Sequence, residues 1–175
     1  MNLNRRQLLI FGLTGGAALA GAGLLGFAPA GGVLDDPGHR YGVLNEADRA
    51  VLAAVVPVIL DGALPAENPE ESVRAVLRDI DGAIGLLPLR VRAELRQLFD
   101  LLDGKLGRVV LAGVWASWAQ ASPEAIDGFL NDWRGSYLDL LRTAYGGLHE
   151  LVLGVWYGNP ASWPTIRYPG PPAIV

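Results

Sequence analysis

The amino-acid sequence predicts an all-α protein, with a single helical domain over residues 31–158 and an extended, proline- and aromatic-rich tail over residues 159–175. Three observations lead to this prediction. Apolar residues recur at steps of three and four in several segments, helix-capping residues precede some of them, and no run alternates apolar and polar residues for long enough to form a strand. About five to six helices are expected around one core, because the length that remains after residue 30 suits one domain.

The first helix is expected from about Glu46 to Leu60, after a polar lead-in. Asn45 can cap it by accepting a hydrogen bond from a backbone N–H, and Asp48 adds negative charge to its first turn. Pro57 should bend this helix or end it early. The residues expected on its apolar face are Leu52, Val55, Val56 and Ile59.

Two helices are expected next, one from about Glu70 to Leu86 and one that starts at Pro88 and stops at Gly104. The first should bury Val73, Val76, Leu77, Ile80 and Ile84, and the second should bury Val91, Leu95, Leu98, Phe99 and Leu102. The charged residues of the second helix that should face water are Arg90, Arg92, Glu94 and Arg96.

The middle of the chain carries an apolar segment and then a strong helix start. Residues 106–120 are largely apolar and nearly uncharged, which predicts a central helix or one that faces a partner. A capping Ser122, Pro123 at the first helical position and an early Glu124 predict a further helix that reaches about Arg134.

The last helix is expected from about Tyr137 to Tyr157 and has the clearest periodicity. Its predicted buried face contains Leu138, Leu141, Tyr145, Leu148, Val152 and Val155. Gly146 and Gly147 lie inside it and should cost about 1 kcal/mol each unless another helix approaches closely.

The tail from Asn159 to Val175 combines prolines, which favour an extended path, with aromatic residues, which need to be covered. Such a tail either wraps around its own domain or docks on a partner. Its composition does not separate these two possibilities.

Residues 1–30 are predicted to be a twin-arginine export signal. Arg5 and Arg6 stand before Gln7-Leu8-Leu9, and the glycine-diluted stretch that follows carries no charge as far as Phe27. Ala28 and Ala30 supply the small residues that a signal peptidase reads. Cleavage is favoured over an uncleaved membrane anchor, because the glycines weaken a spanning helix and the Ala-Pro-Ala sequence suits the peptidase.

Composition excludes several classes of protein. The chain has no cysteine, so iron–sulfur clusters, thiolate zinc sites and covalently attached haem are excluded. The net charge of the whole chain is −4, and it becomes more negative when Arg5 and Arg6 are removed, so nucleic-acid binding is not expected.

No constellation of catalytic residues is recognisable in the sequence. His149-Glu150 begins like the helical zinc-protease motif, but Leu153 occupies the position of the second histidine. The acidic pairs Asp35-Asp36, Glu70-Glu71 and Asp79/Asp81 are expected to be solvated charge. We therefore expect no catalytic, metal-binding or cofactor-binding residue in this chain.

The tail motif and the first helix resemble a known family. Residues 44–52, Trp156-Tyr157-Gly158-Asn159-Pro160, Trp163-Pro164 and residues 168–172 (Tyr-Pro-Gly-Pro-Pro), together with the twin-arginine signal, resemble the gluconate 2-dehydrogenase small-subunit family (subunit three). The resemblance covers most of the chain after residue 30 and is most specific in the tail.

The resemblance implies a non-catalytic partner of a periplasmic FAD-dependent dehydrogenase of the glucose–methanol–choline type, often accompanied by a cytochrome c subunit. The FAD would lie in the large subunit, which oxidises sugars or alcohols and is exported folded on the signal of the small subunit, through the twin-arginine translocase. Trp156, Tyr157, Trp163 and Tyr168 are the expected anchors for the large subunit, although they could equally seal the helical core of their own domain. A stand-alone periplasmic binding or scaffold protein is the alternative.

Overall fold

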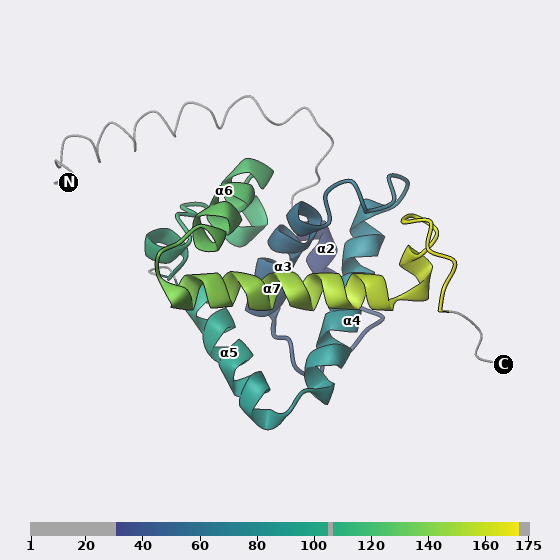
Figure 1. Ribbon diagram of the computed structural model, residues 1–175, viewed down its shortest axis with the longest axis horizontal. Coiled ribbons are helices and arrows are strands. Elements are labelled where there is room, and N and C mark those ends of the chain that lie inside the picture. Colours follow the sequence, from purple (N-terminus) through teal and green to yellow (C-terminus); the bar gives the residue numbers. More distant parts are fainter. Residues whose placement is uncertain (1–30, 105–106, 172–175) are drawn as a thin grey trace, which may run out of the picture.

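The structure is a computed structural model that describes residues 31–104 and 107–171. These residues form six α-helices and three short helical turns, and they contain no strand, so the predicted all-α class is confirmed. In Figure 1, helix α7 crosses in front of a V formed by α4 and α5, and α6 lies over the first half of α7. The predicted signal segment, with Arg5, Arg6, Ala28 and Ala30, lies outside the described residues.

Helix α3 (Glu46–Ile59) is the central helix of the core. All residues from Val51 to Pro57 are buried, and α3 contacts α2 (Gly31–Leu34) and each of the four later helices. The sequence analysis assigned only one apolar face to this helix, but a helix that is apolar on all sides is a buried one. Pro57 lies in the last turn, and α3 ends two residues after it.

Helices α4 (Pro69–Leu86) and α5 (Leu89–Asp103) lie where the sequence predicts them. All five residues expected to be inward in α4 are buried, whereas in α5 only Phe99 and Leu102 are. Leu95 and Leu98 are half-buried and Val91 is exposed, because the first half of α5 extends away from the core toward the point of the V (Figure 1). The predicted inward face of α5 is therefore correct only in its second half.

The predicted central helix over residues 106–120 is wrong. The chain forms a π-helical turn over Gly107–Leu111, an irregular segment, and a 3-10 turn over Trp118–Gln120. Gly113 has a φ of +67°, which a helix cannot accommodate, and the nearby Val109 and Val114 are weak helix formers. Trp118 is buried and donates its indole N–H to the Leu102 carbonyl at 2.9 Å.

Helices α6 (Pro123–Arg134) and α7 (Asp139–Gly158) complete the core. The predicted cap of α6 is confirmed, since the Ser122 hydroxyl accepts a hydrogen bond from the Ala125 N–H at 3.3 Å. Helix α7 starts two residues later than predicted, so Leu138 precedes it and is exposed, while Leu148 and Val152 are buried as expected. Within the ranges that the structure describes, no helix is both long and apolar enough to span a membrane.

Candidate interaction surface at the end of helix α7

The tail folds into consecutive turns as far as Arg167, instead of following from its start the extended path that its prolines suggested, and residues 168–170 lie outside any turn. Asn159 caps a short 3-10 turn (Pro160–Ser162), and its side-chain oxygen accepts a hydrogen bond from the Ala161 N–H at 3.0 Å. The Arg167 N–H donates to the Pro164 carbonyl at 3.1 Å and closes a further turn. Prolines at early turn positions have the backbone angle that these turns need, so here they support compact structure.

Trp163 organises the tail. Its indole N–H donates to the Tyr157 carbonyl at 2.9 Å, and its ring meets the Tyr168 ring edge-on, with 5.2 Å between the centroids. Gly170 has a φ of +95° and passes so close to the Trp163 ring that a Cβ atom there would lie 2.9 Å from it. The tail is thus folded around one tryptophan at the end of α7.

Two further hydrogen bonds attach the tail to the helical domain. The Ser162 hydroxyl is buried and donates to the Trp156 carbonyl at 2.6 Å. The Asn159 amide donates to the Asp79 carboxylate of α4 at 2.7 Å, across 80 residues of sequence. The tail therefore keeps a defined position relative to α4 and α7.

The structure brings together three of the four predicted anchor residues. Tyr157 and Tyr168 are 47% and 44% exposed, and Trp163 lies half-buried between them. Trp156 is only 7% exposed and belongs to the core, so its indole ring is not available as a surface anchor. Trp156 and Tyr157 were both predicted as anchors from their aromatic residue type, but adjacent helical residues point in different directions.

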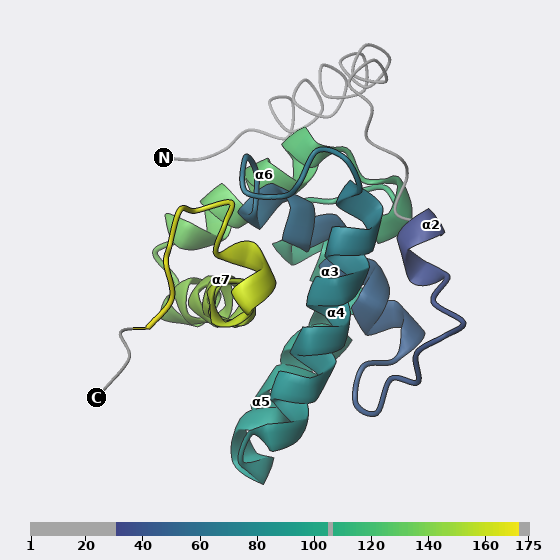
Figure 2. The same ribbon diagram turned by 90° about the vertical axis from the view of Figure 1, so that its right-hand side faces the viewer.

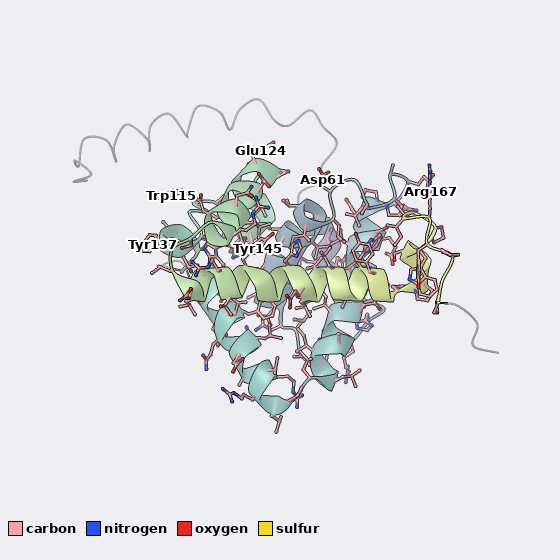
Figure 3. All side chains as sticks on the ribbon, viewed as in Figure 1. Asp61, Trp115, Glu124, Tyr137, Tyr145 and Arg167 are labelled. Carbon is pink, nitrogen blue, oxygen red and sulfur yellow. The ribbon has the colours of Figure 1, made fainter. Side chains whose placement is uncertain are left out.

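The sequence analysis missed two exposed residues of the same surface, Ile166 and Arg167. Ile166 is 38% exposed, and Arg167 is also exposed and has a φ of +55°. Figure 3 places Arg167 at the opposite end of the molecule from the exposed aromatic residues Trp115 and Tyr137. Nothing in the sequence indicated a left-handed residue here, because arginine rarely adopts that conformation.

Buried carboxylates form a second polar feature, and they correct the expectation that the acidic pairs are solvated. Asp81 on α4 accepts hydrogen bonds from three successive backbone N–H groups, those of Gly42, Val43 and Leu44, at 2.8–2.9 Å. Burial raises the pKa of Asp81, but these three hydrogen bonds outweigh it and keep the pKa below its ordinary value. Asp81 thereby fixes the loop before α3 against α4.

Asp36 holds the beginning of the same loop. The Arg78 guanidinium donates to both oxygens of Asp36 at 2.8 and 2.7 Å and, as the main cause, lowers the pKa of Asp36 to about 2. The Tyr41 hydroxyl also donates to Asp36 at 3.1 Å. Burial, reinforced by this carboxylate, raises the pKa of Tyr41 to about 12.

Arg96 faces water only in part, whereas the sequence suggested a fully solvated side chain. Its guanidinium donates to both oxygens of Asp48, one at 2.6 Å, and the Asp48 side chain is fully buried. This bond is the main cause of a raised pKa at Arg96. Asp48 also accepts the Asn45 backbone N–H at 2.9 Å, so it closes a reciprocal cap on α3 and joins α3 to α5.

An apolar groove of about 610 Å³ separates α5 from α7. Its size is within the range of small-molecule sites. Its wall contains one charged residue, Glu94, and the lining residues that set its apolar character are Leu95, Leu98, Leu101, Leu141, Ala144 and Gly147.

The described residues contain no group of three histidine or acidic side chains that could hold a metal ion. His149 is half-buried, and its ring stacks on that of Tyr145 with 5.3 Å between the centroids. No protein-family model, no curated protein and no solved structure matches the chain. The resemblance to the gluconate 2-dehydrogenase small subunits stays a prediction from the sequence.

Proposed function

We propose that this chain is the non-catalytic small subunit and export carrier of a periplasmic FAD-dependent dehydrogenase of the glucose–methanol–choline type, which oxidises sugars or alcohols. FAD belongs to the large subunit, and a cytochrome c subunit can complete the complex. Arg5 and Arg6 are the residues by which the twin-arginine translocase recognises the small subunit together with its bound large subunit. The complex, or an uncleaved signal, would associate the chain with the membrane.

The observation that carries this proposal is the aromatic surface at the end of α7. Tyr157 and Tyr168 are each nearly half exposed, and Trp163 joins them, because its indole N–H bonds the Tyr157 carbonyl and its ring packs against the Tyr168 ring. Aromatic side chains in defined positions supply much of the binding energy of protein interfaces. These residues also belong to the tail motif on which the family resemblance rests.

The test is co-purification from the periplasm of the host. The full chain carries a tag on a flexible linker after Val175, and the proteins that accompany it are identified by mass spectrometry and flavin absorbance. We expect a flavoprotein dehydrogenase without a signal of its own. In the control, Arg5 and Arg6 are both replaced by lysine, and both proteins should then disappear from the periplasm. Recovery of the small chain alone, monomeric and soluble, would contradict the proposal.

A stand-alone periplasmic binding protein is the second candidate function. The observation in its favour is the apolar groove between α5 and α7, whose volume suits a small ligand. Co-purification of a small apolar molecule without any protein partner would favour this candidate.

A further inference from the structure

Arg167 has an unusual backbone conformation for its residue type. Among the described residues it is the only non-glycine residue with a positive φ, at +55°. This region is unfavourable for residues with a Cβ atom, and arginine lacks the short polar side chain that eases it for asparagine. Strain of this kind persists only where the surrounding structure imposes it, and it concentrates at functional sites.

The contacts around Arg167 impose this conformation. The Arg167 N–H donates to the Pro164 carbonyl at 3.1 Å, and the next residue, Tyr168, donates its N–H to the Trp163 carbonyl at 2.9 Å. The ring of Tyr168 also packs against Trp163, which is itself bonded to the end of α7. The turn that carries Arg167 is therefore held on both sides.

The guanidinium of Arg167 makes no hydrogen bond or ion pair with any residue in the described part of the chain. Its side chain is exposed, and it is the only charged residue between Asn159 and Pro171. Among the described residues, the strained backbone therefore brings the Arg167 guanidinium no partner. Its result is a held backbone that presents a positive charge, without a partner in the described part of the chain, on a protein whose net charge is −4.

The neighbours of Arg167 are the exposed apolar residues of the same end of the molecule. We define the tail tip as Ile166, Arg167 and Tyr168 together with Tyr157, and the three apolar members are 38%, 44% and 47% exposed in that order. Arginine and aromatic residues are the types most enriched among the dominant residues of protein interfaces. A surface whose backbone is already ordered before binding loses less conformational entropy when a partner binds.

We propose that the tail tip is the surface that holds the folded flavoprotein, and that Arg167 binds a carboxylate of an acidic, partly apolar patch on it. A planar guanidinium can donate two parallel hydrogen bonds to a carboxylate, which favours an acidic partner surface. This inference rests on the proposed function and adds to it the residues and the charge of the contact.

Three substitutions separate charge from backbone conformation. Arg167→Gly removes the charge and relieves the strain, Arg167→Lys keeps both, and Arg167→Glu reverses the charge. The matched control is Arg90→Glu, since Arg90 is an exposed arginine of α5, and Figure 1 shows this helix apart from the tail. Each full-length chain is purified from the periplasm and titrated against the flavoprotein isolated from the wild-type complex, and thermal unfolding verifies the fold of each variant.

We expect Arg167→Gly to weaken binding by about tenfold or more, with an unchanged or higher unfolding temperature. Arg167→Glu should weaken binding further, Arg167→Lys should lie between the wild type and Arg167→Gly, and Arg90→Glu should bind like the wild type. Wild-type binding by Arg167→Gly and Arg167→Glu would overturn this inference and leave the proposed function intact. Failure of the wild-type chain to retain any flavoprotein would overturn both.

Discussion

At the scale of single residues, three aspartates carry much of the long-range order of the fold. Asp36 and Asp81 attach the loop before α3 to α4, and Asp48 joins α3 to α5. All three carboxylates are largely removed from water, and each has several donors. Their pairing could not be predicted, because the partners are 37 to 48 residues apart and every aspartate has the same local signature.

Asp81→Asn should destabilise the domain of residues 31–175 by about 1–3 kcal/mol, because three backbone N–H groups, that of Leu44 buried, lose a charged acceptor. Urea unfolding measures the change. Asp35→Asn is the control, since Asp35 is exposed, and it should change stability by less than about 0.5 kcal/mol. Equal effects of the two substitutions would mean that the loop does not depend on Asp81.

Arg96→Ala should cost about 2–3 kcal/mol, because it leaves the fully buried Asp48 carboxylate without its cation. The estimate is below that for a fully buried pair, since the Arg96 side chain is 36% exposed. Arg90→Ala on the same helix breaks only an exposed pair with Glu94 and should cost less than about 0.5 kcal/mol. Chemical denaturation of the two variants side by side tests this difference.

At the scale of elements, the sequence predicted helices well where a cap or a proline marks the boundary. Ser122 and Pro123 mark the start of α6, and Pro88 and Gly104 mark the two boundaries of α5. The prediction failed over residues 106–120, where a high apolar content was interpreted as a helix although no cap or helical period supported it. The surface at the end of α7 was predicted in part. Aromatic residue type suggests a contact residue, but it does not tell whether the side chain points to the surface or into the core.

Ser122→Ala should destabilise the protein by about 1 kcal/mol, because the first turn of α6 loses its side-chain acceptor. Ser117 precedes the 3-10 turn Trp118–Gln120 and makes no capping hydrogen bond, so Ser117→Ala should have almost no effect. Thermal unfolding of both variants distinguishes a true cap from a serine that only resembles one. A similar loss in both would contradict the assignment.

Gly146→Ala should stabilise the protein by about 0.5–1 kcal/mol. Gly146 lies inside α7, and no atom lies within 4 Å of the position that its Cβ would occupy, so alanine gains helix propensity without a clash. Gly170→Ala should act in the opposite direction, since its φ is +95° and its Cβ would meet Trp163 at 2.9 Å. Opposite shifts in unfolding temperature are the expected result.

At the scale of the whole molecule, the helices surround α3, and the described chain runs from α2 on one side to the tail on the other (Figure 2). The fold class followed from helical periodicity, capping residues and the absence of an alternating apolar and polar run. The arrangement of the helices did not, because it depends on which apolar faces meet, and several faces of similar composition could have met. The continuous apolar run in α3 was the one sequence signal for its central place.

Stability of the domain should fall as the pH falls from about 4 to about 2. The pKa of Asp36 is about 2 in the folded protein, against an ordinary value of 3.8, so the unfolded chain binds its proton first and acid favours unfolding. At pH values above this window, Asp36 should contribute up to about 2 kcal/mol to the free energy of unfolding. In Asp36→Asn, unfolding free energy measured across the window should depend less steeply on pH. An unchanged slope would place the acid sensitivity elsewhere.

If the chain exports a passenger as proposed, the positions of α2 and the tail on opposite sides of α3 and α4 have a consequence for the order of events (Figure 2). The residues that a translocase would recognise join the domain at Gly31, whereas the tail tip is remote from that point. A passenger bound at the tip would therefore travel behind the carrier and leave the leading side clear. Membrane machinery and passenger could then occupy the same small protein at the same time without competing for it.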